Sequence, residues 1–277
     1  MSNIVKRGIT GAVYVLSVIA AVYLPPEVCF IYFGVISMIG LHEFYRNMRQ
    51  TTTVSPNPFG YLLGLAAYVL LGGEIFWSFH RNVILYALAL LLLLLFIVPI
   101  SELYRKKEKP FTNIAYTLLG VMYVVVPLSC ANILRINLFP SIVLMSIFIF
   151  AWCNDTFAYL TGMWLGKHKL FERISPKKTW EGCIGGVVSV IIASVIIVYF
   201  NNTVELYQIL PLAIITSVVG VYGDLIESMW KRQIGIKDSG NILPGHGGIL
   251  DRFDIMLLVL PACTMVAIVL FKVFYRL

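Results

Sequence analysis

The chain has 277 residues, of which 59% are hydrophobic and only 13% charged, and its mean hydropathy is +0.87. A soluble domain carries about 25% charged residues, so this composition excludes an ordinary soluble protein and indicates a surface that meets lipid. The net charge of +7 does not indicate nucleic-acid binding, because basic nucleic-acid binders are much less apolar. In a membrane protein such cations set the orientation and attract anionic lipid or nucleotide.

Apolar runs long enough to cross a bilayer follow one another along the chain, and they predict an all-α polytopic membrane protein with nine spans. The predicted spans are 8–24, 28–46, 59–76, 83–100, 114–134, 141–164, 181–200, 209–229 and 254–274. The first run follows Lys6 and Arg7 as in a secretory signal, but no small-residue cleavage site ends it, so we expect a retained span. The five cysteines lie singly, without metal-binding spacing.

Nine spans place the two termini on opposite sides of the membrane. All but four of the 21 Lys and Arg residues then fall on the side of the N-terminus, the exceptions being Arg81, Arg135, Lys272 and Arg276. Because Lys and Arg concentrate in cytoplasmic loops, we predict a cytoplasmic N-terminus. We expect one integral membrane domain over 1–277, in which 1–140 form a scaffold and 141–277 carry the active site.

Acidic side chains from different predicted spans fall at one depth of the membrane. Asp155 lies in the cytoplasmic half of the sixth span, Asp224 near the inner end of the eighth, and Asp251 and Asp254 open the ninth. A charge at mid-bilayer costs roughly 2.5–3.5 kcal/mol, so charges gathered beside hydrocarbon indicate a function. We therefore predict that these carboxylates converge. Structural pairing with Lys or Arg is the alternative for each acid alone, and we expect it for Glu43.

Spacing near the last two spans favours a metal site. Four polar residues follow the spacing i, i+3, i+4 and i+7, which places them on one face of a helix. They are Asp224, Glu227, Ser228 and Lys231. Asp251 and Asp254 are also three residues apart, so both can point at one ion. Mg²⁺ takes one or two carboxylates plus substrate phosphate, and no His or Cys cluster supports zinc. We predict Asp224, Asp251 and Asp254 as metal ligands and leave the role of Glu227 open.

The predicted cytoplasmic loop that precedes the seventh span supplies cations. Ser175-Pro176 is typical of a helix start, with Ser as N-cap and Pro at the first helical position, so we expect the helix to begin there. Lys177, Lys178 and Thr179 would lie in its first turn, where free N–H groups can bind phosphate. Cations are unfavourable at a helix N-terminus unless an anion offsets them. The alternative is that both lysines are ordinary residues of an inside loop.

The second cytoplasmic loop, residues 230–253, combines glycines with fixed cations. Glycine lets the backbone approach a ligand closely, and the loop contains Gly235, Gly240, Gly245, Gly247 and Gly248. The cations that could hold phosphates are Lys231, Arg232, Lys237 and Arg252, the arginines in bidentate fashion. The turn around His246 leads directly into Asp251 and Asp254, so it could deliver an anion onto a carboxylate pair.

At these residues the chain resembles the bacterial phosphatidate cytidylyltransferases, also called CDP-diacylglycerol synthases. The family signature S-x-x-K-R-x4-K-D…P-x-H-G-G-x-x-D-R-x-D is matched by Ser228, Lys231, Arg232, Lys237, Asp238, Pro244, His246, Gly247, Gly248, Asp251, Arg252 and Asp254. Upstream the resemblance includes Asp155-Thr156, Ala158-Tyr159, Ser175-Pro176, Lys178-Thr179 and Glu181-Gly182, and it covers about residue 150 to the C-terminus. Phe157 departs from the pattern, because many members have glycine there, so we do not rest specificity on Asp155.

The resemblance implies a reaction of CTP with phosphatidate that gives CDP-diacylglycerol and pyrophosphate, with Mg²⁺ as cofactor and room for a monovalent cation such as K⁺. It implies an active site at the cytoplasmic face of the bacterial inner membrane, and it is compatible with a homodimer. The residues expected to act on the phosphates are Lys231, Arg232, Lys237, His246 and Arg252. Those expected to bind substrate are Asp155, Ser175, Lys177, Lys178, Thr179 and Ser228.

Two other classes of function remain open. Acids within spans also mark the ion paths of transporters, although here the outer halves of the spans carry almost no charge. A related lipid enzyme, such as a CTP-dependent polyprenol kinase, would release CDP in place of pyrophosphate. The D-G-x-x-A-R pattern of CDP-alcohol transferases does not occur in the sequence.

Overall fold

The computed structural model describes residues 3–73, 81–135, 139–242, 245 and 247–275, and most of these residues are helical. Seven of the described helices are long and apolar enough to cross a membrane, and two shorter apolar helices cover Gly8–Tyr23 and Phe59–Gly72. The prediction of an all-α polytopic membrane protein is therefore confirmed. The chain divides into two compact units, the first made of residues 1–136 and 233–253 and the second of residues 137–232 and 254–277.

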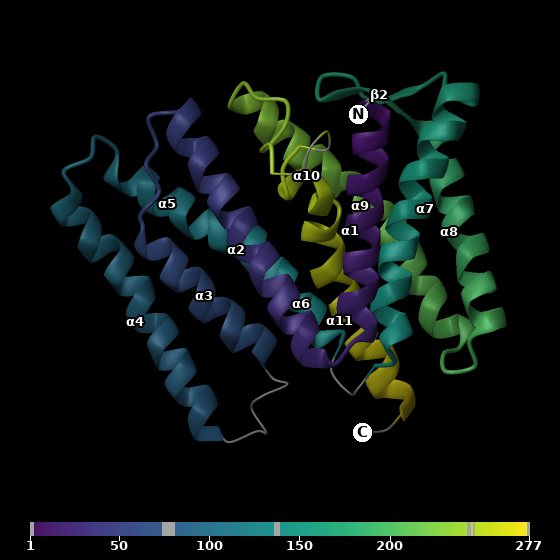
Figure 1. Cartoon of the computed structure of the whole chain (residues 1–277), viewed down its shortest axis with the longest axis horizontal. Helices are drawn as coiled ribbons and strands as arrows, with labels where there is room; N and C mark the ends of the chain where they lie inside the picture. The colour runs from purple at the N-terminus through teal and green to yellow at the C-terminus, as the bar shows by residue number, and fades with distance from the viewer. Residues whose placement is uncertain (1–2, 74–80, 136–138, 243–244, 246, 276–277) are drawn as a thin grey trace. The chain divides into compact units, whose positions relative to one another are not determined.

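The first unit contains most of the predicted scaffold spans (Figure 1). Its elements are α1 (Asn3–Tyr23), α2 (Pro26–Thr51), α3 (Phe59–Gly72), α4 (Arg81–Arg105), α5 (Pro110–Gly120), the π-helical segment η2 (Val121–Val125), α6 (Val126–Ile133) and the short α10 (Leu250–Phe253). Proline opens α2 and α5, where its missing N–H costs no hydrogen bond. The π-helical segment ends at Val125, two residues before Pro127, which cannot donate a helical hydrogen bond.

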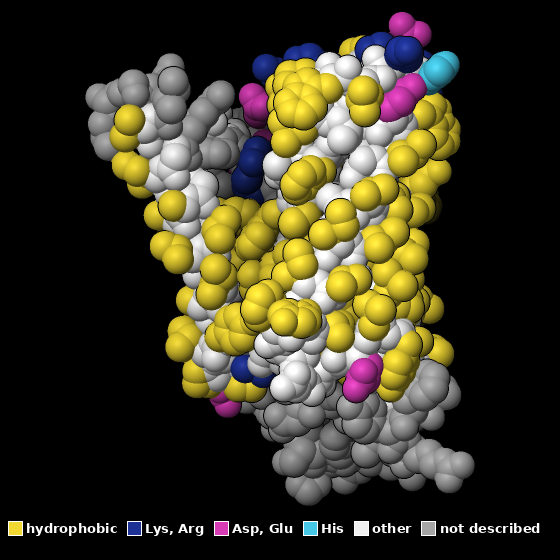
Figure 2. Space-filling view, turned by 90° about the vertical axis from the view of Figure 1, so that its right-hand side faces the viewer, with side chains coloured by type: hydrophobic (Ala, Val, Ile, Leu, Met, Phe, Trp, Pro, Cys, Tyr) yellow, Lys and Arg dark blue, Asp and Glu magenta, His cyan; other side chains and the backbone are white. Residues whose placement is uncertain are grey.

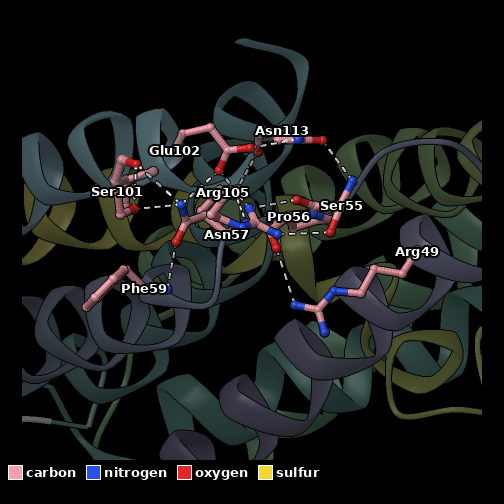
Figure 3. A network of polar contacts seen from close by, with 11 residues as sticks. Arg49, Ser55, Pro56, Asn57, Phe59, Ser101, Glu102, Arg105 and Asn113 are labelled. Atoms are coloured by element: carbon pink, nitrogen blue, oxygen red, sulfur yellow. Dashed lines mark hydrogen bonds and ion pairs between the residues drawn. The ribbon is translucent and has the colours of Figure 1, made fainter. Parts of the chain in front are cut away.

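A buried polar network holds one end of the first unit together (Figure 3). Glu102 on α4 is 3% exposed and accepts hydrogen bonds from Asn57 (2.9 Å), Asn113 (2.7 Å) and Arg105 (2.6 Å). Arg105 also donates to the carbonyl of Ser55 at 3.0 Å. A buried carboxylate is tolerated only when its oxygens are paired in this way. The network thus ties the segment before α3 to the end of α4 and the start of α5.

The second unit contains all six residues predicted to bind substrate, two on helices and four on a strand. Its elements are α7 (Ser141–Leu165), β1 (Lys169–Phe171), β2 (Ser175–Thr179), α8 (Trp180–Phe200), α9 (Leu206–Gln233), whose last residue belongs to the first unit, and α11 (Met256–Tyr275). Figure 2 shows mainly hydrophobic side chains along the helices of this face, with many of the charged side chains gathered at one end. This distribution suits helices surrounded by lipid.

Small residues let α7 and α8 pack at close range, side by side in Figure 1. A Cβ on Gly182 would lie 2.7 Å from the carbonyl oxygen of Ala158, and one on Gly186 would overlap the side chain of Asn154. Close backbone contact through small residues is the usual way in which helices associate in lipid, where the hydrophobic effect between helices is weak.

The predicted start of the α8 helix at Ser175-Pro176 is wrong. Residues Ser175–Thr179 form β2, which pairs antiparallel with β1, and the helix begins at Trp180. Thr179 is the N-cap, because its side chain accepts a hydrogen bond from the N–H of Gly182 at 3.2 Å. Pro176 is tolerated because both strands of a two-stranded hairpin are edge strands. Lys177 and Lys178 therefore precede the helix and do not lie in its first turn.

Candidate active site

A cavity of about 500 Å³ lies in the second unit, between α7, the β1–β2 hairpin, the first turn of α8 and the second half of α9. It brings together five residues that the sequence predicts as functional: Asp155, Lys177, Lys178, Thr179 and Asp224. Lys169, which we did not predict, also lines it. A half-open cavity that combines three lysines with two carboxylates suits an anionic ligand and a cation bound together.

The hairpin is held so that its lysines face this cavity. The carboxylate of Glu181, in the first turn of α8, accepts hydrogen bonds from the N–H groups of Lys167 (3.1 Å) and His168 (3.2 Å). It also contacts Nδ1 of His168 at 2.6 Å. Glu181 therefore ties the segment between α7 and β1 to the first turn of α8. The family pattern includes Glu181 but indicates no role for it.

The ammonium group of Lys178 forms an ion pair with the Asp224 carboxylate, with Nζ and Oδ2 2.6 Å apart. The same Nζ lies 3.5 Å from the carbonyl oxygen of Val221. On the other side, Ser228 donates a hydrogen bond to Oδ1 of Asp224 at 3.1 Å. Both members of the ion pair are partly buried. Asp224 is thus oriented from the hairpin and from its own helix, and its charge is partly neutralised.

The residues predicted on one face of α9 do lie on one face. Besides the Ser228–Asp224 hydrogen bond, Lys231 Nζ lies 3.3 Å from Oε1 of Glu227, one helical turn away. Glu227 is fully buried, and it pairs with Lys231 on the same helix. The role of Glu227, which the sequence left open, is therefore at least to hold Lys231 at this end of α9. Arg232 is exposed.

Asp254 joins this group through a close approach of backbone to backbone. It lies in the turn between α10 and α11, where its Oδ1 accepts the N–H of Ile255 at 2.8 Å. A Cβ on Gly223 would lie 2.9 Å from the carbonyl oxygen of Asp254, so glycine at this position lets the turn reach α9. The Asp254 carboxylate is within electrostatic reach of Glu227 and Asp224 and, more weakly, of Asp155. The second unit therefore gathers acids from α7, α9 and the start of the last span.

The donor groups fit a hard cation that the substrate helps to bind. Within the described part of the chain, no three His, Cys, Asp or Glu side chains are arranged to hold a metal ion by themselves. Mg²⁺ does not need such a set, because it keeps several waters and takes one or two carboxylates together with phosphate oxygens. Asp224 and Asp254 could supply such carboxylates, because Asp254 is within electrostatic reach of Asp224, and Lys178 beside Asp224 could bind a phosphate.

Asn154 is a polar residue of this site that sequence reasoning missed. It is 3% exposed, it lines the cavity, and its Oδ1 accepts a hydrogen bond from Ser217 on α9 at 2.5 Å. The signal available was an Asn next to Asp155 in an apolar span. Thr179 lines the cavity too, but its hydroxyl oxygen caps α8. Ser175 and Phe157 are not among the residues that line it.

Three further predicted residues, Lys237, Asp251 and Arg252, belong to the first unit. His246 lies outside the described residues. Oδ2 of Asp251 accepts hydrogen bonds from the N–H groups of Ser239 and Gly248, each at 2.8 Å, and from the Ser239 hydroxyl at 3.0 Å. Lys237 is exposed and Arg252 is half-buried in α10. Asp251 and Asp254 are three residues apart but fall in different units, so their joint action on one ion stays a prediction.

Comparison with known proteins shows the family to which the chain belongs. The chain is similar to the phosphatidate cytidylyltransferases of Staphylococcus saprophyticus and Staphylococcus haemolyticus, at 50% identity over 115 residues, or 41% of this chain and 44% of each relative. The enzyme of that name from Staphylococcus epidermidis is 40% identical over 172 residues, 60% of this chain and 64% of the relative. These alignments cover less than two thirds of the relatives. The profile of the cytidylyltransferase family matches residues 5–271, nearly the whole chain. The chain therefore belongs to the cytidylyltransferase family.

Proposed function

We propose that this protein is a phosphatidate cytidylyltransferase, which makes CDP-diacylglycerol and pyrophosphate from CTP and phosphatidate. The observation that carries the proposal is the cavity in which Lys169, Lys177 and Lys178 face Asp155 and Asp224. Membership of the cytidylyltransferase family and the names of the staphylococcal relatives support the choice of substrates.

The chemistry asks for positioning and charge neutralisation more than for a nucleophile on the protein. A phosphate oxygen of phosphatidate attacks the α-phosphorus of CTP, the bond from that phosphorus to the bridging oxygen breaks, and pyrophosphate leaves with the electron pair. Phosphatidate is a phosphate monoester that is already ionised at neutral pH, so the attack needs no general base. Catalysis then rests on alignment of the two phosphates and on cations that offset their charge.

In this proposal the hairpin lysines bind the nucleotide phosphates. Lys178 would exchange part of its pairing with Asp224 for a phosphate oxygen, and Lys177 and Lys169 would add charge at the rim of the cavity. Further cations would hold the leaving pyrophosphate and the lipid phosphate, namely Lys231, Arg232, Lys237 and Arg252. The other predicted groups are Asp155, Ser175, Thr179 and Ser228 as substrate contacts, and His246 as a group that orients a phosphate.

The residues proposed to hold Mg²⁺ are Asp224 and Asp254, with Asp251 as the third predicted ligand. When bound, Mg²⁺ neutralises charge on the nucleotide phosphates. Ser228 keeps the Asp224 carboxylate oriented toward the site through the hydrogen bond to Oδ1. A monovalent cation such as K⁺ would be a second ion at this acidic group.

We also propose nine spans, a cytoplasmic N-terminus and a site at the cytoplasmic face of the bacterial inner membrane. The seven long helices and the two shorter apolar helices correspond one to one with the nine predicted spans. The excess of Lys and Arg on one side supports the orientation. This depth suits the reaction, because CTP comes from the cytoplasm and phosphatidate from the bilayer. The protein would act as a monomer or as a homodimer.

The proposal is tested with purified protein in mixed micelles that contain phosphatidate, labelled CTP and Mg²⁺. We expect CDP-diacylglycerol and pyrophosphate in equal amounts, and no product with chelator. Release of CDP with a phosphorylated lipid would show a kinase instead. Absence of any lipid product, together with ion-driven uptake in proteoliposomes, would show a transporter.

A further inference from the structure

Glu43, for which the sequence indicated only a structural role, is a fully buried carboxylate near the end of α2 that binds a segment about 200 residues away. Its Oε1 accepts the N–H of Ile249 and its Oε2 the N–H of Leu250, both at 3.0 Å. Leu250 is the first residue of α10, which carries Asp251, and Ile249 directly precedes it. The hydroxyl of Ser239 lies 3.2 Å from Oε2 of the same carboxylate.

Ser239 connects Glu43 to Asp251. Its hydroxyl lies 3.0 Å from Oδ2 of Asp251, and a hydroxyl has one proton to donate, so the two carboxylates share it. The N–H groups of Ser239 and Gly248 hold the same Oδ2 at 2.8 Å. A change in the contact between Glu43 and Ser239 therefore alters the hydrogen bonding of the Asp251 carboxylate.

Helix α2 also binds the backbone of Ser239. Asn47 donates a hydrogen bond to its carbonyl oxygen at 2.7 Å and Arg46 donates one at 3.1 Å. Glu43, Arg46 and Asn47 are spaced i, i+3 and i+4, so one face of α2 makes all these contacts. The segment fits closely, because a Cβ on Gly248 would overlap both the Ser239 hydroxyl and the Glu43 carboxylate.

We propose that Glu43 is a positioning residue for Asp251: through Ser239 and the first turn of α10 it sets the orientation in which Asp251 binds its cation. The inference rests on the proposed function, in which Asp251 is a metal ligand. Partners that orient a metal ligand commonly change metal affinity by 10- to 100-fold when they are substituted. A purely structural Glu43 would change stability without changing metal affinity.

The test compares Glu43→Gln and Ser239→Ala with a matched control, Glu102→Gln. Glu102 is also a buried carboxylate of the first unit that binds a connecting segment, but it contacts neither Ser239 nor α10. Mn²⁺ binding to the purified full-length protein is measured by electron paramagnetic resonance, beside thermal unfolding and the Mg²⁺ concentration at half-maximal turnover. Asp251→Asn gives the effect of losing the ligand itself.

We expect Glu43→Gln and Ser239→Ala to weaken Mn²⁺ binding about 10-fold or more and to raise the Mg²⁺ requirement in parallel. Glu102→Gln should lower the unfolding temperature and leave Mn²⁺ binding at the wild-type value. Ser239→Ala decides the matter if Glu43→Gln does not fold. Wild-type Mn²⁺ affinity in folded Ser239→Ala, or in Asp251→Asn, overturns the inference even when the wild type makes CDP-diacylglycerol. If the wild type makes no cytidylylated lipid but Glu43→Gln still weakens Mn²⁺ binding, the proposed reaction is wrong and the positioning role of Glu43 stands.

Discussion

Lys178 of the hairpin and Asp224 of α9 form an ion pair of 2.6 Å at the wall of the cavity. The pair joins a residue expected to bind phosphate to one expected to bind metal. A lysine in this place orients the carboxylate, and its ammonium group can turn toward an incoming phosphate. If the proposed roles hold, this contact couples the proposed nucleotide site to the proposed metal site inside the second unit.

Replacing Lys178 with Ala should weaken the use of CTP. A hydrogen bond to a charged group contributes about 1.5–3 kcal/mol, so we expect kcat/KM for CTP to fall roughly 10- to 100-fold. Steady-state kinetics at saturating phosphatidate measures the change. Lys167→Ala is the control, because Lys167 lies before the same hairpin but does not line the cavity. Equal kinetics for wild type and Lys178→Ala would show that this lysine only sets membrane orientation.

Replacing Asp224 with Asn should remove most activity at every Mg²⁺ concentration. The change deletes a carboxylate from the predicted metal site and leaves Lys178 without its ion-pair partner. Since a catalytic metal supplies several kcal/mol, we expect turnover to fall about 100-fold or more. Glu205 is an exposed acid directly before α9, so Glu205→Gln controls for loss of negative charge alone. Turnover near the wild-type value at saturating Mg²⁺ would exclude Asp224 from the metal site.

Replacing Gly223 with Ala should separate Asp254 from α9. The new Cβ would lie 2.9 Å from the Asp254 carbonyl oxygen and 3.1 Å from Cα of Ile255, both backbone atoms that cannot move aside cheaply. We expect a destabilisation of about 1–3 kcal/mol and a loss of Mg²⁺-dependent activity. Gly8→Ala on α1, where no atom lies within 4 Å of the added Cβ, serves as control. If Gly223→Ala and Gly8→Ala have the same unfolding temperature and turnover, the close approach between Gly223 and Asp254 is not needed for activity.

Replacing Asn57 with Ala should destabilise the first unit without altering substrate affinity. Its Nδ2 donates to Glu102 at 2.9 Å and to Ser101 at 2.7 Å, so the variant leaves a buried carboxylate short of a donor. We expect a loss of about 1–3 kcal/mol, seen as a lower unfolding temperature in detergent. The KM for CTP should stay at the wild-type value in the protein that remains folded. A raised KM would show that this network acts on the site.

Local chemistry accounts for what could be read from the sequence. The membrane-spanning character of the helices follows from the length and apolarity of each run, and the pairing of Glu227 with Lys231 follows from helix periodicity alone. The family pattern also identified Lys178 and Thr179, and the depth and spacing of the acids identified Asp224; all three line one cavity. Each of these inferences depends on residues that are near one another in the chain.

Contacts between distant segments account for the rest. Pairing with β1 turned Ser175–Thr179 into a strand where a local signal favoured a helix, and the backbone approach at Gly223 selected Asp254 as the neighbour of Asp224. Likewise, Glu43 acquired its role from N–H groups more than 200 residues away. Hydrophobicity and helix period act over a few turns of chain, whereas the partners of a buried carboxylate are settled only when separate helices pack together.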